Sequence, residues 1–162
     1  RLVIIRYNHE GGLLSLFCKE YKYKCGGVVK THKYSGRVKR FIDLAAKVAQ
    51  QSDSPDYRHG AVLARGSNAV NVSFNKNSFC SFGQRFRDPN QGNPTLHAEL
   101  GVILGMERKI TEGATVYVAR VGKNGDYRLS KPCHMCYAAM KHVGIKRVVY
   151  TINNQVAGSY KL

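Results

Sequence analysis

The feature that most constrains the fold of this chain is a change of hydrophobic period at residue 35, after which helix-type and strand-type segments alternate. Ser35 can serve as the N-cap of an amphipathic helix, because apolar residues follow at helical spacing: Val38, Phe41, Ile42, Ala45, Val48 and Ala49. Residues 60–64 and 69–74 predict a strand hairpin. Helices over 96–108 and 132–142 then alternate with strands over 114–121 and 146–152, which predicts an α/β sandwich.

The size and composition of the chain indicate one globular domain with its own core. The chain has 162 residues, of which 43% are hydrophobic and 22% charged, so a disordered or collagen-like chain is excluded. The longest early apolar runs, residues 2–5 and 13–17, are too short for a membrane span of about 20 residues or for a secretory signal. We therefore expect a cytoplasmic protein with no membrane partner.

Positive charge is concentrated near the N-terminus. The chain carries 26 Lys and Arg against 10 Asp and Glu, a net charge of +16, and residues 1–41 alone hold ten basic and two acidic residues. We predict a basic N-terminal extension over residues 1–34, a strand or hairpin, followed by a domain over residues 35–162. Such charge favours a polyanion, so nucleic acid is a candidate partner of the extension, and lysines that serve only solubility are the alternative.

Two short motifs carry residues suited to metal chemistry, His97-Ala98-Glu99 and Pro132-Cys133-His134-Met135-Cys136. One imidazole and two thiolates match a Zn²⁺ site whose fourth position stays open for water, as in catalytic zinc centres. Pro132 suits the first turn of a helix, so Cys133 and Cys136 share one helical face near the positive end of the helix dipole, which favours thiolates. We expect Zn²⁺ to be bound by His97, Cys133 and Cys136.

Glu99 is the candidate proton carrier of this site. It lies two residues beyond His97, about 200° around a helix, so it would not bind the same ion through the same face but can point at a water on the metal. Zinc lowers the pKa of its water toward 7, and a neighbouring carboxylate can pass the proton to a ring nitrogen and then to a leaving amine.

Other readings of the reactive residues remain open. Cys133 and Cys136 alone could form a redox pair, and His134 could close a structural zinc site, although it would point away from the face that the two cysteines share. The long loop before His97 is rich in Asn, Ser, Gly and Pro, and its phenylalanines would serve as core, lid or base-stacking residues: Phe79, Phe82 and Phe86. A second zinc site could be formed by His9, Cys18, Cys25, His32 and Cys80. The commoner explanation of such scattered cysteines is that they are buried in the core.

At the two motifs the chain resembles the zinc-dependent cytidine and deoxycytidylate deaminase superfamily, whose signature is His-x-Glu followed by Pro-Cys-x-x-Cys. The resemblance spans roughly residues 38–160. It implies a three-layer α/β/α sandwich with a mixed sheet of about five strands, a homo-oligomer, and Glu99 as general acid/base. It also implies that Asn75 hydrogen-bonds the sugar and that the backbone around Ala98 and Ser130 reads the base. A purely structural turn at Asn75 is the alternative.

Residues 130–133 and 144–151 look most like the deoxycytidylate type, which includes phage-encoded members. The resemblance thus implies deamination of cytosine in a nucleoside or nucleotide, giving ammonia and the uracil product, in the host cytoplasm if the source is viral. A polynucleotide deaminase acting on tRNA adenosine or on single-stranded DNA or RNA cytosine is the first alternative, because basic residues and tyrosines interleave in residues 1–41. A catalytically inert nucleic-acid-binding or assembly module is the second, which the intact His97, Glu99, Cys133 and Cys136 set disfavours.

Overall fold

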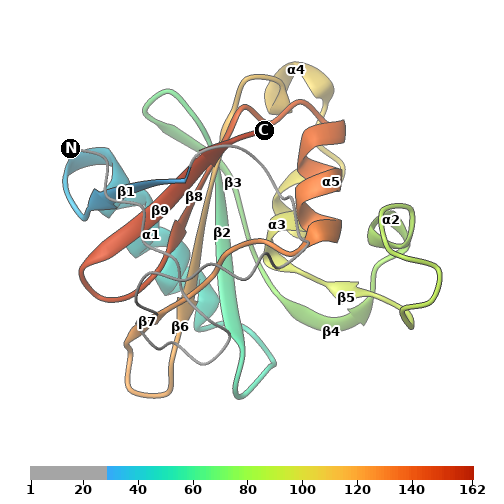
Figure 1. Cartoon of the computed structure of the whole chain (residues 1–162), viewed down its shortest axis with the longest axis horizontal. Coiled ribbons are helices and arrows are strands. Elements are labelled where there is room, and N and C mark those ends of the chain that lie inside the picture. The colour runs from blue at the N-terminus through green and yellow to red at the C-terminus, as the bar shows by residue number, and fades with distance from the viewer. Residues whose placement is uncertain (1–28) are drawn as a thin grey trace, which may run out of the picture.

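A computed structural model describes residues 29–162, and the sequence predictions for residues 1–28 lie outside the described residues. A mixed sheet with the strand order β1-β9-β8-β6-β2-β3 forms its centre, and β7 pairs with the end of β6 (Figure 1). Its strands are β1 (Lys30–Lys33), β2 (Arg58–Arg65), β3 (Asn68–Phe74), β6 (Thr115–Val121), β7 (Tyr127–Arg128), β8 (Arg147–Thr151) and β9 (Val156–Lys161). The sequence located four of these strands, β2, β3, β6 and β8. With β1, β7 and β9 the sheet has seven strands, whereas the resemblance implies about five.

The direction of the strands follows from their connections. β2 and β3 form the predicted antiparallel hairpin, and β8 and β9 are also antiparallel neighbours. β6 and β8 are parallel, with Val116 opposite Val148, and parallel neighbours need a crossover. The helix α5 (His134–His142) supplies that crossover, so the start of α5 lies at the end of the sheet where β6 ends.

Helices cover both faces of the sheet, which confirms the predicted three-layer α/β/α sandwich (Figure 1). The helix α1 (Gly36–Ala49) packs Phe41, Ile42 and Ala45 on one face. On the other face lie α3 (Ala98–Ile103) and α5, with a core that includes Leu100 and Met140. Alternation along the strands divides their side chains between these two cores.

The contact between α1 and β2 depends on the absence of a side chain at Gly60. A Cβ built there would lie 2.0 Å from the carbonyl oxygen of Ala45 and 2.6 Å from the amide nitrogen of Ala49. The helix backbone therefore rests almost directly on the strand, one residue beyond His59.

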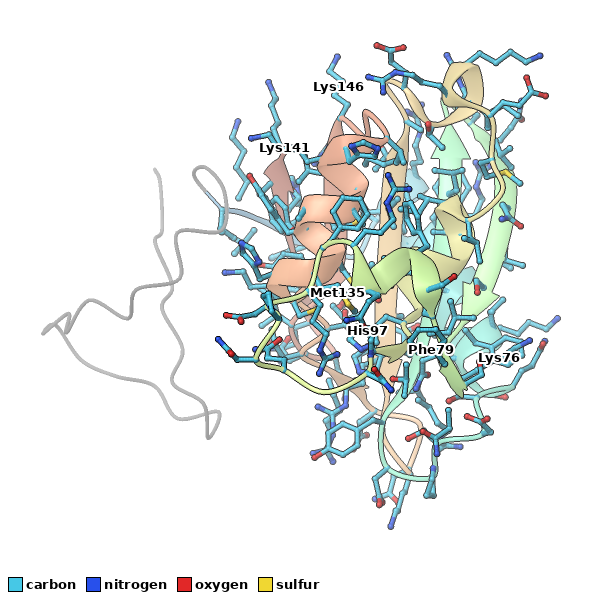
Figure 2. The ribbon with its side chains drawn as sticks, turned by 90° about the vertical axis from the view of Figure 1, so that its right-hand side faces the viewer. Lys76, Phe79, His97, Met135, Lys141 and Lys146 are labelled. Carbon is cyan, nitrogen blue, oxygen red and sulfur yellow. The ribbon has the colours of Figure 1, made fainter. Side chains whose placement is uncertain are left out.

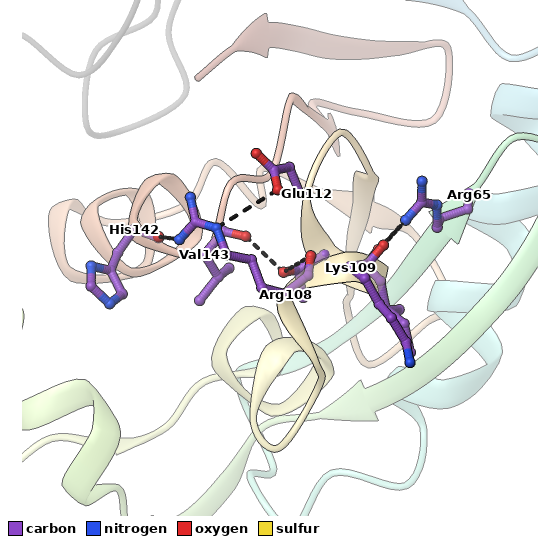
Figure 3. Close-up of polar contacts among 8 residues, drawn as sticks. Arg65, Arg108, Lys109, Glu112, His142 and Val143 are labelled. Carbon is purple, nitrogen blue, oxygen red and sulfur yellow. Dashed lines mark hydrogen bonds and ion pairs between the residues drawn. The ribbon is translucent and has the colours of Figure 1, made fainter.

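The helix predicted over residues 96–108 is shorter than expected. α3 ends at Ile103, because Leu104 donates its N–H to the carbonyl of Leu100 and then turns extended, with ψ of 126°. The chain resumes as α4 (Arg108–Thr111), which lies at the end of α5 away from the two motifs. There Arg108 donates to the carbonyl of His142 at 3.2 Å and forms an ion pair with Glu112, and Arg65 donates to the carbonyl of Lys109 (Figure 3).

The loop predicted over residues 75–94 contains short elements. A two-stranded sheet joins β4 (Lys76–Phe79) to β5 (Thr95–Leu96), and one helical turn, α2 (Ser81–Gln84), lies between them. The sheet brings the chain back to His97 immediately after β5, so the segment positions this residue.

The first described residues add a strand to the sheet edge. β1 pairs antiparallel with β9, and Tyr34, which follows it, donates to the carbonyls of Asn153 and Val156 at 2.8 and 2.9 Å. This strand belongs to the predicted extension, whose boundary at residue 35 stays a prediction. Within residues 29–162, none of the helices has the length and apolar character needed to cross a membrane.

Candidate metal centre

Both motifs lie at helix starts on the same face of the sheet. His97 is the N-cap residue of α3, with φ of −76° and ψ of 151°, and Cys133 is the N-cap residue of α5. Cys136 follows in the first turn of α5 and is buried. Figure 2 shows His97 beside Met135 at the N-terminal end of α5, whereas Lys141 and Lys146 lie at its other end.

The three predicted ligand atoms converge. The Nδ1 atom of His97 lies 3.3 Å from Sγ of Cys136 and 3.6 Å from Sγ of Cys133, and all three ligand atoms are within 4.8 Å of one another. A tetrahedral ion with the usual zinc bond lengths separates a nitrogen from a sulfur ligand by about 3.6 Å. The site therefore fits Zn²⁺, and Nδ1 is the nitrogen that faces the sulfurs.

The thiols are prepared unequally for a metal. Hydrogen bonds from Cys136 and His97 lower the pKa of Cys133 to about 4, although burial opposes this. Burial raises the pKa of Cys136, and a hydrogen bond to Cys133 raises that of His97. Zn²⁺ binds deprotonated sulfur and a nitrogen free of its proton, so the raised pKa values of Cys136 and His97 oppose metal binding and the lowered pKa of Cys133 favours it.

Glu99 lies in the first turn of α3, and its side chain is only 5% exposed. Burial raises the pKa of its carboxyl above the ordinary value, and the nearby charge of His97 opposes this. Within the described part of the chain the carboxyl forms no ion pair with Lys or Arg. A buried carboxyl with a raised pKa beside a cavity is a candidate for proton transfer.

The metal-site cavity, of about 430 Å³, opens beside these residues. Its wall includes His97, Ala98, Glu99 and Cys133, so the two motifs meet at one hollow. The rest of the wall comes from the segment before β2, the start of β2, the junction of β3 and β4, and β5, with Tyr57, His59, Asn75, Lys76 and Thr95.

Asn75 lines the cavity, but both polar atoms of its side chain already have backbone partners. Oδ1 accepts from the N–H of His59 at 2.8 Å, and Nδ2 donates to the carbonyl of Tyr57 at 2.8 Å. The amide thus fixes the segment that enters β2, in agreement with the structural alternative. Its contact with a sugar stays a prediction.

Of the two positions predicted to read the base, Ala98 lines the cavity and Ser130 does not. Ser130 is buried, and its hydroxyl donates to the carbonyl of Val118 at 2.9 Å. Its N–H donates to the carbonyl of Thr151 at 2.9 Å. Base recognition by the backbone at these positions stays a prediction.

Sequence reasoning gave no role to His59, although the structure places it in the cavity wall. Burial, followed by the charges of Arg120 and His97, lowers the pKa of His59 to about 4, so the ring is neutral near pH 7. Alternation along β2 puts His59 on the same face as Ala61 and Leu63, and that period was the available signal.

The other cysteines and histidines of the described region do not form a second metal group. His32 contacts Ser159 at 2.8 Å on β9, whereas buried Cys80 accepts from the N–H of Gly83 in α2. His134 is exposed and outside the ligand group, and Cys133 and Cys136 are free thiols. The remaining proposed members, His9, Cys18 and Cys25, lie outside the described residues.

The aromatic residues before His97 divide between core and surface. Phe82 and Phe86 pack against the core and on each other, with ring centroids 5.2 Å apart. Phe79 is 61% exposed on β4, near Lys76 (Figure 2).

A solved structure shares the fold of this chain. No curated protein sequence matches the chain. The dCMP deaminase of cyanophage S-TIM5, solved in apo form, has the same fold, with a TM-score of 0.50 and 18% identity over 71% of this chain and 82% of that one. Two crystal forms of Acinetobacter baumannii RibD match 72% of this chain at TM-scores of 0.46 and 0.45, with 19% and 18% identity, and the chain spans only 28% of their length.

The family assignment rests on most of the domain. Residues 36–152 match the family described as the cytidine and deoxycytidylate deaminase zinc-binding region, and this segment includes both motifs and the cavity. The ligand chemistry of His97, Cys133 and Cys136 agrees with a zinc cofactor. The chain therefore belongs to the cytidine and deoxycytidylate deaminase family, with Zn²⁺ as its cofactor.

Proposed function

We propose that the protein catalyses hydrolytic deamination of cytosine in a nucleoside or nucleotide of the dCMP or cytidine type. The observation that carries this proposal is the position of Glu99, a buried carboxyl in the wall of the same cavity as His97 and Cys133. A metal held only for structure would have no need of a buried acid beside an open cavity.

Zn²⁺, when bound, supplies a Lewis acid that lowers the pKa of a water molecule toward 7. Glu99 then takes a proton from the attacking water on a carboxylate oxygen and delivers it to ring nitrogen N3 as the oxygen adds to C4. A second proton, from the hydroxyl that the water leaves on C4, would pass through the same carboxyl to the exocyclic amine. The C4–N bond then breaks, ammonia leaves, and the C4 oxygen becomes the carbonyl of the uracil ring. One water is consumed, and the carboxylate is regenerated.

The remaining wall residues would hold the substrate. Ala98 would offer its backbone to the base, as predicted, and Asn75 would approach the sugar from another part of the wall. His59 is neutral near pH 7 and would therefore act as a hydrogen-bond partner without repelling the metal.

A direct comparison of substrates tests the proposal. The zinc-loaded protein is offered dCMP, cytidine, a cytosine-containing single-stranded DNA and tRNA, and ammonia release is measured for each. We expect release from dCMP or cytidine. Release from none of them, by protein with one zinc per chain, would support the inert module in place of an enzyme.

One observation favours a polynucleotide substrate as the second candidate. Lys76 lines the cavity, and Phe79 at the other end of β4 is exposed, a combination of cation and aromatic ring that suits a single strand. Phe79→Ala should then reduce turnover of single-stranded DNA much more than turnover of dCMP. Nucleic-acid binding by residues 1–34, assembly as a homo-oligomer and a cytoplasmic location belong to the proposal as well.

A further inference from the structure

A second cavity adjoins the metal-site cavity and shares Tyr57 with it. This arginine cavity has a volume of about 430 Å³ and lies around the ends of β6 and β7. Its wall consists of Asp56, Tyr57, Arg120, Gly122, Lys123, Asn124 and Arg128, three cations against one carboxylate. Such a hollow suits an anionic group.

The register of the sheet leads from one cavity to the other. His59 on β2 lies opposite Arg120 on β6, and Arg120 lies opposite Arg128 on β7. Residues paired in this way project from the same face of a sheet, and neighbouring strands are roughly 5 Å apart. The two arginines thus continue outward in a row from His59, which lines the metal-site cavity.

The acidic residues near the arginine cavity are already paired with other cations. Asp56 forms an ion pair with Lys123 at 2.9 Å, and Asp126 lies 3.7 Å from Arg128. Arg120 has no carboxylate partner among residues 29–162, so its positive charge is not neutralised there.

Arg120 is also held in place with hydrogen-bonding capacity left over. Its guanidinium lies over the ring of Tyr57, 4.5 Å from the centroid, which fixes its plane. Among residues 29–162, its buried Nε atom has no partner, and one terminal nitrogen donates only to the carbonyl of Asp56 at 3.5 Å. The guanidinium of Arg120 thus has several N–H donors and one long hydrogen bond to the protein. Its planar arrangement of donors matches the oxygens of a phosphate.

We propose that the arginine cavity binds a phosphate group of the substrate through Arg120, so that the enzyme acts on a nucleotide in preference to a nucleoside. This inference rests on the proposed deaminase function and names its substrate class. The phosphate belongs either to a free nucleotide or to the backbone of a single strand, and both present the same anionic oxygens to the guanidinium.

Arg120→Met removes the charge and the donor fork and keeps a side chain of similar length. Activity of the zinc-loaded full chain is measured on deoxycytidine, dCMP and a short single strand with one cytosine. We expect the kcat/KM of dCMP relative to deoxycytidine to fall by about 10- to 100-fold, through the KM for the nucleotide. Arg120→Lys should lie between wild type and Arg120→Met, because it keeps the charge and loses the fork. Arg37→Met removes the same charge at an exposed position of α1 and should leave the ratio of the two kcat/KM values at the wild-type value.

The outcomes separate the sources of the phosphate and the two proposals. If Arg120→Met lowers the kcat/KM of dCMP, the bound phosphate is that of a free nucleotide. If it lowers the kcat/KM of the single strand alone, the bound phosphate belongs to the nucleic-acid backbone. Turnover of deoxycytidine and dCMP with the same kcat/KM, unchanged by Arg120→Met, would overturn the phosphate site and leave the deaminase function intact. If no substrate loses ammonia, binding of inorganic phosphate, followed by amide chemical shifts, still tests the phosphate site. Shift changes in the wild type that Arg120→Met abolishes support the phosphate site, and the absence of such changes refutes it.

Discussion

Glu99→Gln separates proton transfer from every other property of the site. The glutamine side chain has nearly the same shape, so the packing of the first turn of α3 should be retained. The carboxyl is 5% exposed and forms no ion pair with Lys or Arg in the described residues, so its loss leaves no buried cation unpaired. We therefore expect the free energy of unfolding to change by less than about 1 kcal/mol.

Turnover should respond very differently. General acid/base catalysis contributes roughly 10²- to 10⁴-fold, and here one carboxyl would serve both the water and the leaving amine. An amide cannot accept and return that proton, so kcat should fall by at least about 100-fold. Zinc content should stay at one ion per chain, because the predicted ligands are His97, Cys133 and Cys136.

The assay is ammonia release by protein of measured zinc content, with urea unfolding of the same samples. Glu107→Gln is the matched control, because that carboxylate is exposed, lies away from the cavity and pairs, within the described part of the chain, only with Lys109 at 2.7 Å. If Glu99→Gln keeps more than about a tenth of the wild-type kcat, another group moves the proton and the argument from burial fails.

Three further predictions address packing, metal and pH. Gly60→Ala should lower the free energy of unfolding, measured in urea, by about 3 kcal/mol or more, because its Cβ would lie 2.0 Å from the carbonyl oxygen of Ala45. The control Gly92→Ala lies in open space and should change this free energy by less than about 0.5 kcal/mol. Removing zinc with a chelator should lower the Tm reversibly, since the ion joins the starts of α3 and α5. In metal-free protein, the free energy of unfolding should fall by up to about 3 kcal/mol as the pH drops from about 6.5 to about 4, because over that interval His59 binds a proton only in the unfolded chain. His59→Gln should flatten this dependence of the free energy on pH, measured by urea unfolding at each pH.

The sequence predicted the parts of the fold whose signals are local. The helix from residue 36 and the hairpin of β2 and β3 have clear hydrophobic periods and a turn between them. β9 was missed, because Ala157, Gly158 and Ser159 are weak strand formers. They adopt a strand because β8 and β1 pair with them on both sides, and the sequence of residues 156–161 alone does not predict that pairing.

The candidate site divides in the same way. The residues of the two motifs could be named from spacing, because a helix start fixes how His97 relates to Glu99, and Cys133 to Cys136. His59 and Arg120 belong to no motif. Alternation along β2 indicates which face His59 occupies. Its place opposite Arg120 follows from the pairing of β2 with β6, which joins segments about 60 residues apart and leaves no local pattern.

The distance between the ligands is set by close contact of α3 with the sheet. A Cβ on Gly101 would lie 2.0 Å from the hydroxyl oxygen of Ser73, so α3 rests against β3 with no room for a larger residue. The carbonyl of His97 accepts the N–H of Gly101 at 3.0 Å, so the backbone of His97 is part of the same turn. Cys136 is fixed by the burial of α5 in the same core. The separation of 3.3 Å between Nδ1 and this sulfur thus results from two helices packed on one sheet.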